Sequence, residues 1–171
     1  MKISKLSKGK EFPEKFNVLV EIPKGSSVKY DFDHDSGLIE VDRFISSAMA
    51  YPFNYGHIPE TESGDGDPLD VIFIASRSVH PGVIVKARPI GMLEMEDESG
   101  IDNKIIAVGT HHVDPFFINV DTVEDLSSAV REEIRHFYEH YKELEPKKWV
   151  KIKNFHGKEV ALEEIKKSVD K

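Results

Sequence analysis

The stretch Asp65–Asp70, with the sequence DGDPLD, constrains the fold most strongly, because an apolar run follows it at once. Three carboxylates this close repel one another, so they lie either open to water or beside a cation. Pro68 fixes its own φ and pushes Asp67 toward an extended conformation, whereas Gly66 permits an unusual φ. The three carboxylates converge only where the chain bends. The sequence predicts a stiff acidic loop entering a strand; the alternative is a plain solvated turn, since Asp, Gly and Pro are ordinary turn residues.

Length, charge and cysteine usage narrow the class of protein. The 171 residues predict one domain over 1–171, long enough to bury a core without disulfides. Cysteine is absent, and neither a signal peptide nor a membrane-spanning apolar run is recognisable, so we expect a cytoplasmic protein with no membrane partner. The net charge of −8 argues against a nucleic-acid partner but is compatible with a small polyanion bound among metal ions.

The hydrophobic pattern changes from strand-like to helix-like along the chain. Strands are expected over 16–22, 27–32, 38–41, 69–75, 83–95, 105–108 and 149–152, with a hairpin between the second and the third and a bend near Pro89 and Gly91. Apolar residues at three- and four-residue spacing predict a helix over 123–144, capped by Thr122 and ended by Pro146. A final helix is expected over 159–169. This order indicates an α+β fold, with a small barrel as a reasonable arrangement of the strands.

A second acidic segment, 94–102, repeats the character of the first, and Lys104 follows it. The two segments offer five aspartates, and carboxylate oxygens suit hard cations such as Mg²⁺ or Mn²⁺. Cationic and hydroxyl side chains accompany them: Lys29, Arg43, Lys104, Lys142, Tyr55 and Tyr141. Carboxylates that hold metals, together with groups that hold oxyanions, indicate a phosphoryl-transfer site. Taken singly, each of these residues could equally be a solvated charge or part of a core.

The segments together resemble the family I soluble inorganic pyrophosphatases over nearly the whole chain. DGDPLDV at 65–71 has the form D-x-D-P-apolar-D-apolar of that family's signature. Further matches keep the family's order and similar spacing: EIP at 21–23, KY at 29–30, VDRF at 41–44, YPFNYG at 51–56, Asp97 with Asp102 and Lys104, and HYK at 140–142. The resemblance implies a five-stranded closed, OB-like β-barrel with flanking helices. It also implies hydrolysis of pyrophosphate to two orthophosphates with several Mg²⁺ ions per site, Mn²⁺ or Zn²⁺ being substitutes.

The resemblance also implies a role for each matching residue. Asp65, Asp70 and Asp102 are expected to bind the metal pair that holds the nucleophilic water, and Asp97 joins Asp102 in binding metal that arrives with the substrate. Asp67 matches the general base. The phosphate-binding set is Lys29, Arg43, Tyr55, Lys104, Tyr141 and Lys142, and the supporting carboxylates are Glu21 and Asp31. The family commonly has glutamate at position 31, so the shorter Asp31 is expected to reach a metal through a water or after a backbone shift.

Two other readings stay open. His136, Glu139 and His140 match H-x-x-E-H, a pattern found in zinc metalloproteases, on a predicted helix. The chain could also be a metal- or phosphate-binding barrel without activity. In the resembled family, histidines on this helix tend to lie between the subunits of a hexamer. We therefore expect a homohexamer with His136 and His140 near an interface that mild acid loosens.

Overall fold

The computed structural model describes residues 6–169. Within 6–169 the chain forms nine strands, two α-helices and two short 3-10 helices. The strands are β1 (Phe16–Ile22), β2 (Val28–Asp33), β3 (Leu38–Phe44), β4 (Asn54–His57), β5 (Asp70–Ile74), β6 (Ile84–Asp97), β7 (Gly100–Ile101), β8 (Lys104–Gly109) and β9 (Val150–Gly157). The helices are η1 (Pro115–Phe117), η2 (Val123–Asp125), α1 (Ser128–His140) and α2 (Lys158–Lys167).

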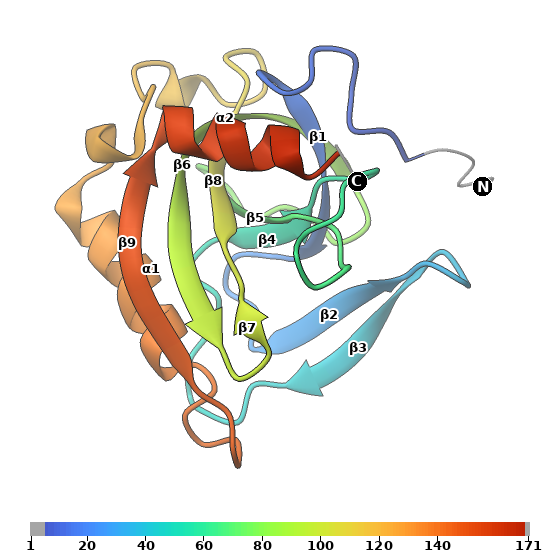
Figure 1. Cartoon of the computed structure of the whole chain (residues 1–171), viewed down its shortest axis with the longest axis vertical. Helices are drawn as coiled ribbons and strands as arrows, with labels where there is room; N and C mark the ends of the chain where they lie inside the picture. The colour runs from blue at the N-terminus through green and yellow to red at the C-terminus, as the bar shows by residue number, and fades with distance from the viewer. Residues whose placement is uncertain (1–5, 170–171) are drawn as a thin grey trace.

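Five strands of the main sheet pair in a ring. The order is β1, β4, β5, β8 and β6, and β6 pairs again with β1. The β5–β8 pair is parallel and the other four pairs of the ring are antiparallel. β6 also pairs with β9, and its register shifts between Pro89 and Gly91, where the sequence predicts a bend. Figure 1 shows α2 lying across one end of β6 and β8, and α1 running alongside β9.

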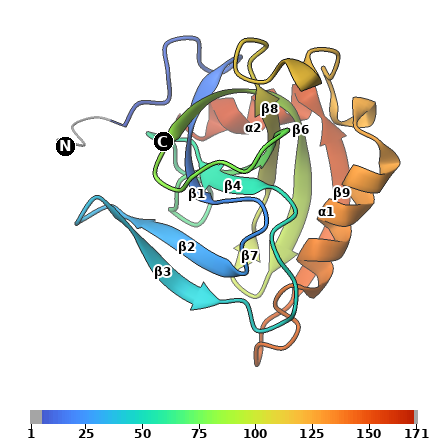
Figure 2. The same ribbon diagram turned by 180° about the vertical axis from the view of Figure 1, so that it is seen from behind.

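β2 and β3 form a separate two-stranded sheet, as the predicted hairpin requires. Figure 2 shows this hairpin extending away from β1 and β4, with its turn directed outward. Its register shifts between Lys29 and Tyr30. The positions of the hairpin side chains are therefore set by a strand pairing that is separate from the main sheet.

The core lies in two clusters on opposite faces of the strand ring. One cluster contains Ile72 and Ile74 of β5 together with Ile134 and Phe137 of α1. The other contains Val71 and Phe73 of β5 together with residues of α2. Because β5 is buried on both faces, its sequence reads as a continuous apolar run rather than as an alternation.

The helix predicted over 123–144 is wrong at both ends. A 3-10 turn, η2, begins after Thr122 with a capping box to Asp125, and Leu126 then turns extended at ψ 144°. Ser127 caps a new helix, α1, which ends at His140, well before Pro146. The apolar spacing continued across the break because residues on both sides of it are buried in the same cluster. The final helix, by contrast, closely matches α2.

Two short strands, β4 and β7, were not predicted. β4 has four buried residues and lies between β1 and β5. At Gly56 a Cβ atom would come 1.9 Å from the carbonyl oxygen of Leu19, so only glycine permits this close pairing. The acidic segment 94–102 continues β6 to Asp97 before it turns into β7. None of the helices in residues 6–169 is long and apolar enough to span a membrane.

Candidate active site

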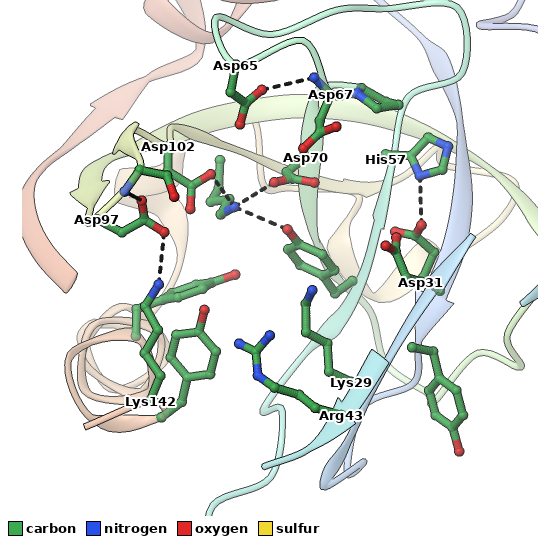
Figure 3. A pocket seen from close by; sticks show the side chains of 18 of the residues that line it. Lys29, Asp31, Arg43, His57, Asp65, Asp67, Asp70, Asp97, Asp102 and Lys142 are labelled. Carbon is green, nitrogen blue, oxygen red and sulfur yellow. Dashed lines mark hydrogen bonds and ion pairs between the residues drawn. The ribbon is translucent and has the colours of Figure 1, made fainter. Parts of the chain in front are cut away.

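A pocket of about 420 Å³ opens between the hairpin, the ends of the main-sheet strands and the segment after α1. Every site residue predicted from the sequence lines this pocket: Glu21, Lys29, Asp31, Arg43, Tyr55, Asp65, Asp67, Asp70, Asp97, Asp102, Lys104, Tyr141 and Lys142. Figure 3 shows five aspartates on one side, which we name the acidic side: Asp65, Asp67, Asp70, Asp97 and Asp102. It shows three cations opposite, which we name the basic side: Lys29, Arg43 and Lys142.

The acidic loop bends as its glycine and proline predict. Gly66 has φ +94°, a conformation that side chains rarely adopt. Asp65 Oδ1 accepts hydrogen bonds from the backbone N of Asp67 at 3.0 Å and from Ser63 Oγ at 2.8 Å. Asp70 is the first residue of β5 and is half-buried. The loop thus turns the carboxylates of Asp65, Asp67 and Asp70 toward one pocket.

Lys104 lies at the centre of the acidic side. Its Nζ donates to Asp70 Oδ2 and to Asp102 Oδ1, each at 2.6 Å, and to the Tyr55 hydroxyl at 3.2 Å. Burial opposes a charge on Lys104, but Asp70 and Asp102 outweigh burial and raise the pKa of its ammonium group. Lys104 therefore stays protonated and neutralises part of the negative charge that the acidic side concentrates.

Part of the negative charge on the acidic side remains uncompensated. Burial, followed by the negative charges of Asp65 and Asp70, raises the pKa of Asp67 above its ordinary value. Burial also raises the pKa of Asp102, and Asp70 adds to the effect while Lys104 opposes it. Both carboxylates are held in an environment that favours a bound proton or another cation.

Lys142 joins the end of α1 to the acidic side. It lies just beyond the C-cap residue Tyr141, and its Nζ is 2.9 Å from Asp97 Oδ2 and 3.2 Å from a Glu98 oxygen. Burial works against ionisation of Asp97, but the hydrogen bond from Lys142 prevails and lowers the pKa of Asp97. Asp97 therefore keeps its negative charge to a lower pH than Asp67 and Asp102, whose pKa values are raised.

The hairpin supplies the other two cations of the basic side. Lys29 Nζ is 3.1 Å from Asp42 Oδ2, and Arg43 Nη1 is 2.8 Å from the same oxygen. Arg43 Nε is also 2.8 Å from Glu145 Oε1, beyond the end of α1. These partly exposed pairs hold both cations at the pocket, where an anionic ligand can compete for them.

Several pocket residues were not predicted as part of the site. They include His34, Tyr51, His57, Glu98, Tyr138 and Lys148. Glu98 lies inside the second acidic segment, so the density of acids there was a usable signal. Tyr51 begins the segment YPFNYG that matches the family, so it also had a usable signal. For the other four residues the sequence carried no comparable signal, because β4 was not recognised and the contacts join distant segments.

The donor chemistry of the acidic side suits a hard divalent cation. All of its side-chain donors are carboxylate oxygens, the ligands that Mg²⁺ and Mn²⁺ prefer. Across the described range 6–169, no group of three or more His, Asp or Glu side chains already stands in position to hold a metal ion. Asp70 and Asp102 are instead turned toward Lys104. Burial raises the pKa values of Asp67 and Asp102, neighbouring carboxylates add to the effect, and a bound cation would oppose both causes.

The H-x-x-E-H segment lies on α1 with its residues engaged elsewhere. The rings of His136 and His140 are 4.6 Å apart, and His140 Nδ1 is 2.9 Å from Glu143 Oε2. Glu139 is 3.9 Å from Arg135 in an i,i+4 pair. None of these residues lines the pocket that holds the predicted site.

A family model described as inorganic pyrophosphatase matches residues 18–171, which is most of the chain. The chain belongs to this family. An inorganic pyrophosphatase from Aquifex pyrophilus is 54% identical over 165 residues, covering 96% of this chain and 93% of the relative. One from Saccharolobus solfataricus is 51% identical over 167 residues, covering 98% and 97%. The structure of an inorganic pyrophosphatase from Coxiella burnetii superposes with a TM-score of 0.92 at 42% identity, covering 96% and 98%.

Membership of the inorganic pyrophosphatase family confirms the resemblance found in the sequence. It favours neither the zinc-protease reading nor the reading as an inactive binding barrel, because the relatives that match nearly end to end are named as pyrophosphatases. The pocket that brings the predicted residues together is therefore a candidate active site, and the roles of its single residues are proposals.

Proposed function

We propose that this pocket hydrolyses inorganic pyrophosphate to two orthophosphates with the help of divalent cations. One observation carries the proposal: a single pocket of about 420 Å³ holds five aspartates on one side and Lys29, Arg43 and Lys142 on the other. Metal ions on the acidic side and phosphate oxygens on the basic side would each meet ligands of the matching chemistry.

The residues that would hold the metals are Asp65, Asp70 and Asp102, with Asp97 joining Asp102 when the substrate arrives. Bound Mg²⁺ would lower the pKa of a water molecule toward about 7 and would offset the negative charge of pyrophosphate. Glu21 and Asp31 line the same pocket and would act as supporting carboxylates beside these ligands. The electrostatic influence of Asp31 on Asp67 supports its place beside the acidic side.

Asp67 is the general base of the proposed reaction. The oxygen of a water bonds to one phosphorus, the bond from that phosphorus to the bridging oxygen breaks, and Asp67 accepts a proton from the water. The raised pKa of Asp67, caused by burial and by Asp65, makes it a better proton acceptor than an ordinary aspartate. Because it remains a carboxylate at neutral pH, it is also ready to accept.

The basic side and the two tyrosines bind and orient the phosphates. Lys29, Arg43 and Lys142 would exchange their present carboxylate partners for phosphate oxygens. Tyr55 and Tyr141 present hydroxyl groups to the same pocket. As negative charge grows on the departing phosphate, these fixed cations stabilise the transition state more than the ground state.

The larger assembly follows from the same family reading. The ring of five paired strands would form the closed, OB-like barrel, and the protein would act in the cytoplasm as a homohexamer.

His136, which is exposed, and His140 would lie near a subunit interface. Sedimentation from neutral pH to about 5 tests this, because protonated histidines would add like charges to the interface. A single species unchanged over that range would contradict the interface role.

The reaction itself is tested by measuring phosphate release from pyrophosphate with Mg²⁺, and again with excess chelator. Rapid release that requires the metal is the expected result. If pyrophosphate binds in the presence of Mg²⁺ by calorimetry while Mg²⁺, Mn²⁺ and Zn²⁺ all fail to support release, the protein is a binder and the proposal is wrong.

A further inference from the structure

Glu21 is a carboxylate buried at the edge of the pocket, and it depends on two donors. Its residue is 4% exposed, which is unusual for an acid. Oε1 accepts a hydrogen bond from the backbone N of Phe32 at 3.1 Å, and His57 Nδ1 is 3.0 Å from the same oxygen. Because a buried carboxylate needs its hydrogen bonds, both donors fix where Glu21 lies.

These two donors come from different sheets. Phe32 belongs to β2, in the separate hairpin, whereas His57 belongs to β4 in the main sheet. Glu21 itself is in β1, which pairs with β4. The chain of contacts from His57 through Glu21 to Phe32 therefore ties the hairpin to the main sheet.

The hairpin carries Lys29, Asp31 and Arg43, whereas β5 carries Asp70 on the opposite side of the pocket. His57 is paired in register with Asp70, so it lies directly beside the acidic side. The next residue before Phe32 is Asp31, whose Oδ1 also accepts from the Phe32 amide at 3.0 Å. The position of this one amide thus affects Glu21, Asp31 and the strand that holds Lys29.

His57 is itself held in place by rings of the hairpin. Its ring centroid is 6.1 Å from that of Phe32 and 5.8 Å from that of His34. The residue is 4% exposed, and its Nε2 has no hydrogen-bond partner among the described residues. Within residues 6–169, the His57 side chain therefore makes its polar contact through Nδ1, with Glu21. Figure 3 shows this contact as the dashed line from the labelled His57.

We propose that His57 is a positioning residue for the pyrophosphatase site. Its Nδ1–H orients Glu21, and Glu21 in turn holds the Phe32 amide and sets the hairpin cations at their working distance from the acidic side. His57 touches neither substrate nor metal in this account. The proposal rests on the proposed function for its kinetic consequence, but its structural part can be tested without any activity.

The structural part is tested first in the unaltered protein. Because a carboxylate can only accept, His57 Nδ1 must carry the hydrogen. Nitrogen-15 NMR of the histidine rings at neutral pH is expected to find Nδ1 of His57 protonated. A bare Nδ1 would overturn the proposal whether or not the protein hydrolyses pyrophosphate.

The variants His57→Phe and His57→Asn separate the hydrogen bond from ring packing. Phenylalanine keeps a ring but removes the donor, whereas the Asn side-chain amide can donate from near the Nδ1 position. Hydrogen exchange over residues 28–44 is expected to quicken in His57→Phe and to return toward normal in His57→Asn. Exchange over β8 is expected to stay unchanged in both.

Steady-state kinetics test whether the hairpin binds the substrate less tightly in the variants. We expect His57→Phe to raise KM for pyrophosphate roughly 10-fold, the lower range for loss of an outer-shell partner, with a smaller change in kcat. His57→Asn should restore KM. His112→Phe, at an exposed position in the turn after β8, is the matched control and should change nothing.

Two results would overturn the role. One is a folded His57→Phe with normal KM and normal hairpin exchange. The other is a folded His57→Asn that behaves as His57→Phe does, which would show that the ring and not the donor matters. If neither variant hydrolyses pyrophosphate and the unaltered protein does not either, the function fails, while the NMR and exchange results still decide the role of His57.

Discussion

The two sides of the pocket are built in opposite ways. The acidic side grows from the main sheet and its loops, where Asp70 and Asp102 are packed around the buried Lys104. The basic side comes from a separate hairpin and the segment after α1, and Lys29 and Arg43 there are partly exposed. Lys104 therefore holds Asp70 and Asp102 in place, whereas the hairpin cations make partly exposed ion pairs that a ligand can replace. This difference suggests that the acidic side binds metal before substrate arrives and that the basic side responds to the substrate.

The largest effect is expected from Asp70→Asn, which removes a negative charge from the acidic side. Metal binding and the stabilisation of developing charge should both be lost, so the rate should fall by about 10³-fold or more. Phosphate release measured across a Mg²⁺ titration should show that the variant needs more Mg²⁺ for half-maximal rate and also turns over more slowly. Asp35→Asn, in the exposed hairpin turn, is the control and should behave as the unaltered protein does.

Asp67→Asn should separate the general base from the metal ligands of the acidic side. Turnover should fall roughly 100-fold, at the low end for loss of a general base, while Mg²⁺ affinity changes less. Turnover assays paired with Mg²⁺ titrations separate the two effects. Equal losses of both would mean that Asp67 is a metal ligand instead.

The pH dependence of the unaltered enzyme follows from the same residue. Asp67 acts as a base only when ionised, and burial together with Asp65 raises its pKa above 3.8. Activity should therefore be present above this raised pKa and disappear as the pH falls through it. The acid limb of the rate profile should be absent in Asp67→Asn, and full rate for this variant across the pH range would contradict the base assignment.

A smaller effect, confined to substrate binding, is expected from Lys29→Gln on the basic side. Loss of one charge-assisted hydrogen bond to phosphate should raise KM about 10-fold and leave Mg²⁺ affinity unchanged. Steady-state kinetics at saturating Mg²⁺ measure this. Glu40→Gln, at an exposed position on β3, serves as the matched control on the same hairpin.

The smallest effect on activity is expected from Ser127→Ala. Ser127 Oγ caps α1 by accepting from the backbone N of Val130. Its loss should cost about 1 kcal/mol of folding free energy and lower Tm by roughly 2–4 °C. Turnover per folded molecule at 25 °C should not change, because Tyr141 and Lys142 remain fixed by contacts at the far end of the helix. A loss of turnover without unfolding would show that the helix position itself tunes the basic side.

The sequence predicted which residues line the pocket better than it predicted the strands and contacts that hold them. The acidic loop 65–70 was recognised because turn residues beside an apolar strand are a local pattern. The structure gives Gly66 the unusual φ that was expected and begins β5 at Asp70, one residue after the predicted start. β4 was missed because four residues are too few to show a periodicity. His57 was missed with it, since its pairing with Glu21 joins residues 36 positions apart and leaves no local mark.

The helix prediction failed for a related reason. Burial in one core cluster gives the same apolar spacing whether the backbone is continuous or broken, so Val123 and Leu126 read as part of a helix that begins only after Ser127. The break is set by the capping interactions of Thr122 with Asp125 and of Ser127 with Val130. Apolar spacing does not show where a helix is interrupted, so Ser127 was not recognised as the N-cap.

The central claim is that the acidic side binds metal independently of the basic side. Calorimetric titration of Mg²⁺ into the substrate-free protein, compared with Asp70→Asn and Lys29→Gln, tests it most directly. We predict that Lys29→Gln binds Mg²⁺ as the unaltered protein does and that Asp70→Asn loses most of this binding. Undiminished binding in Asp70→Asn, or an equal loss in Lys29→Gln, would contradict the account.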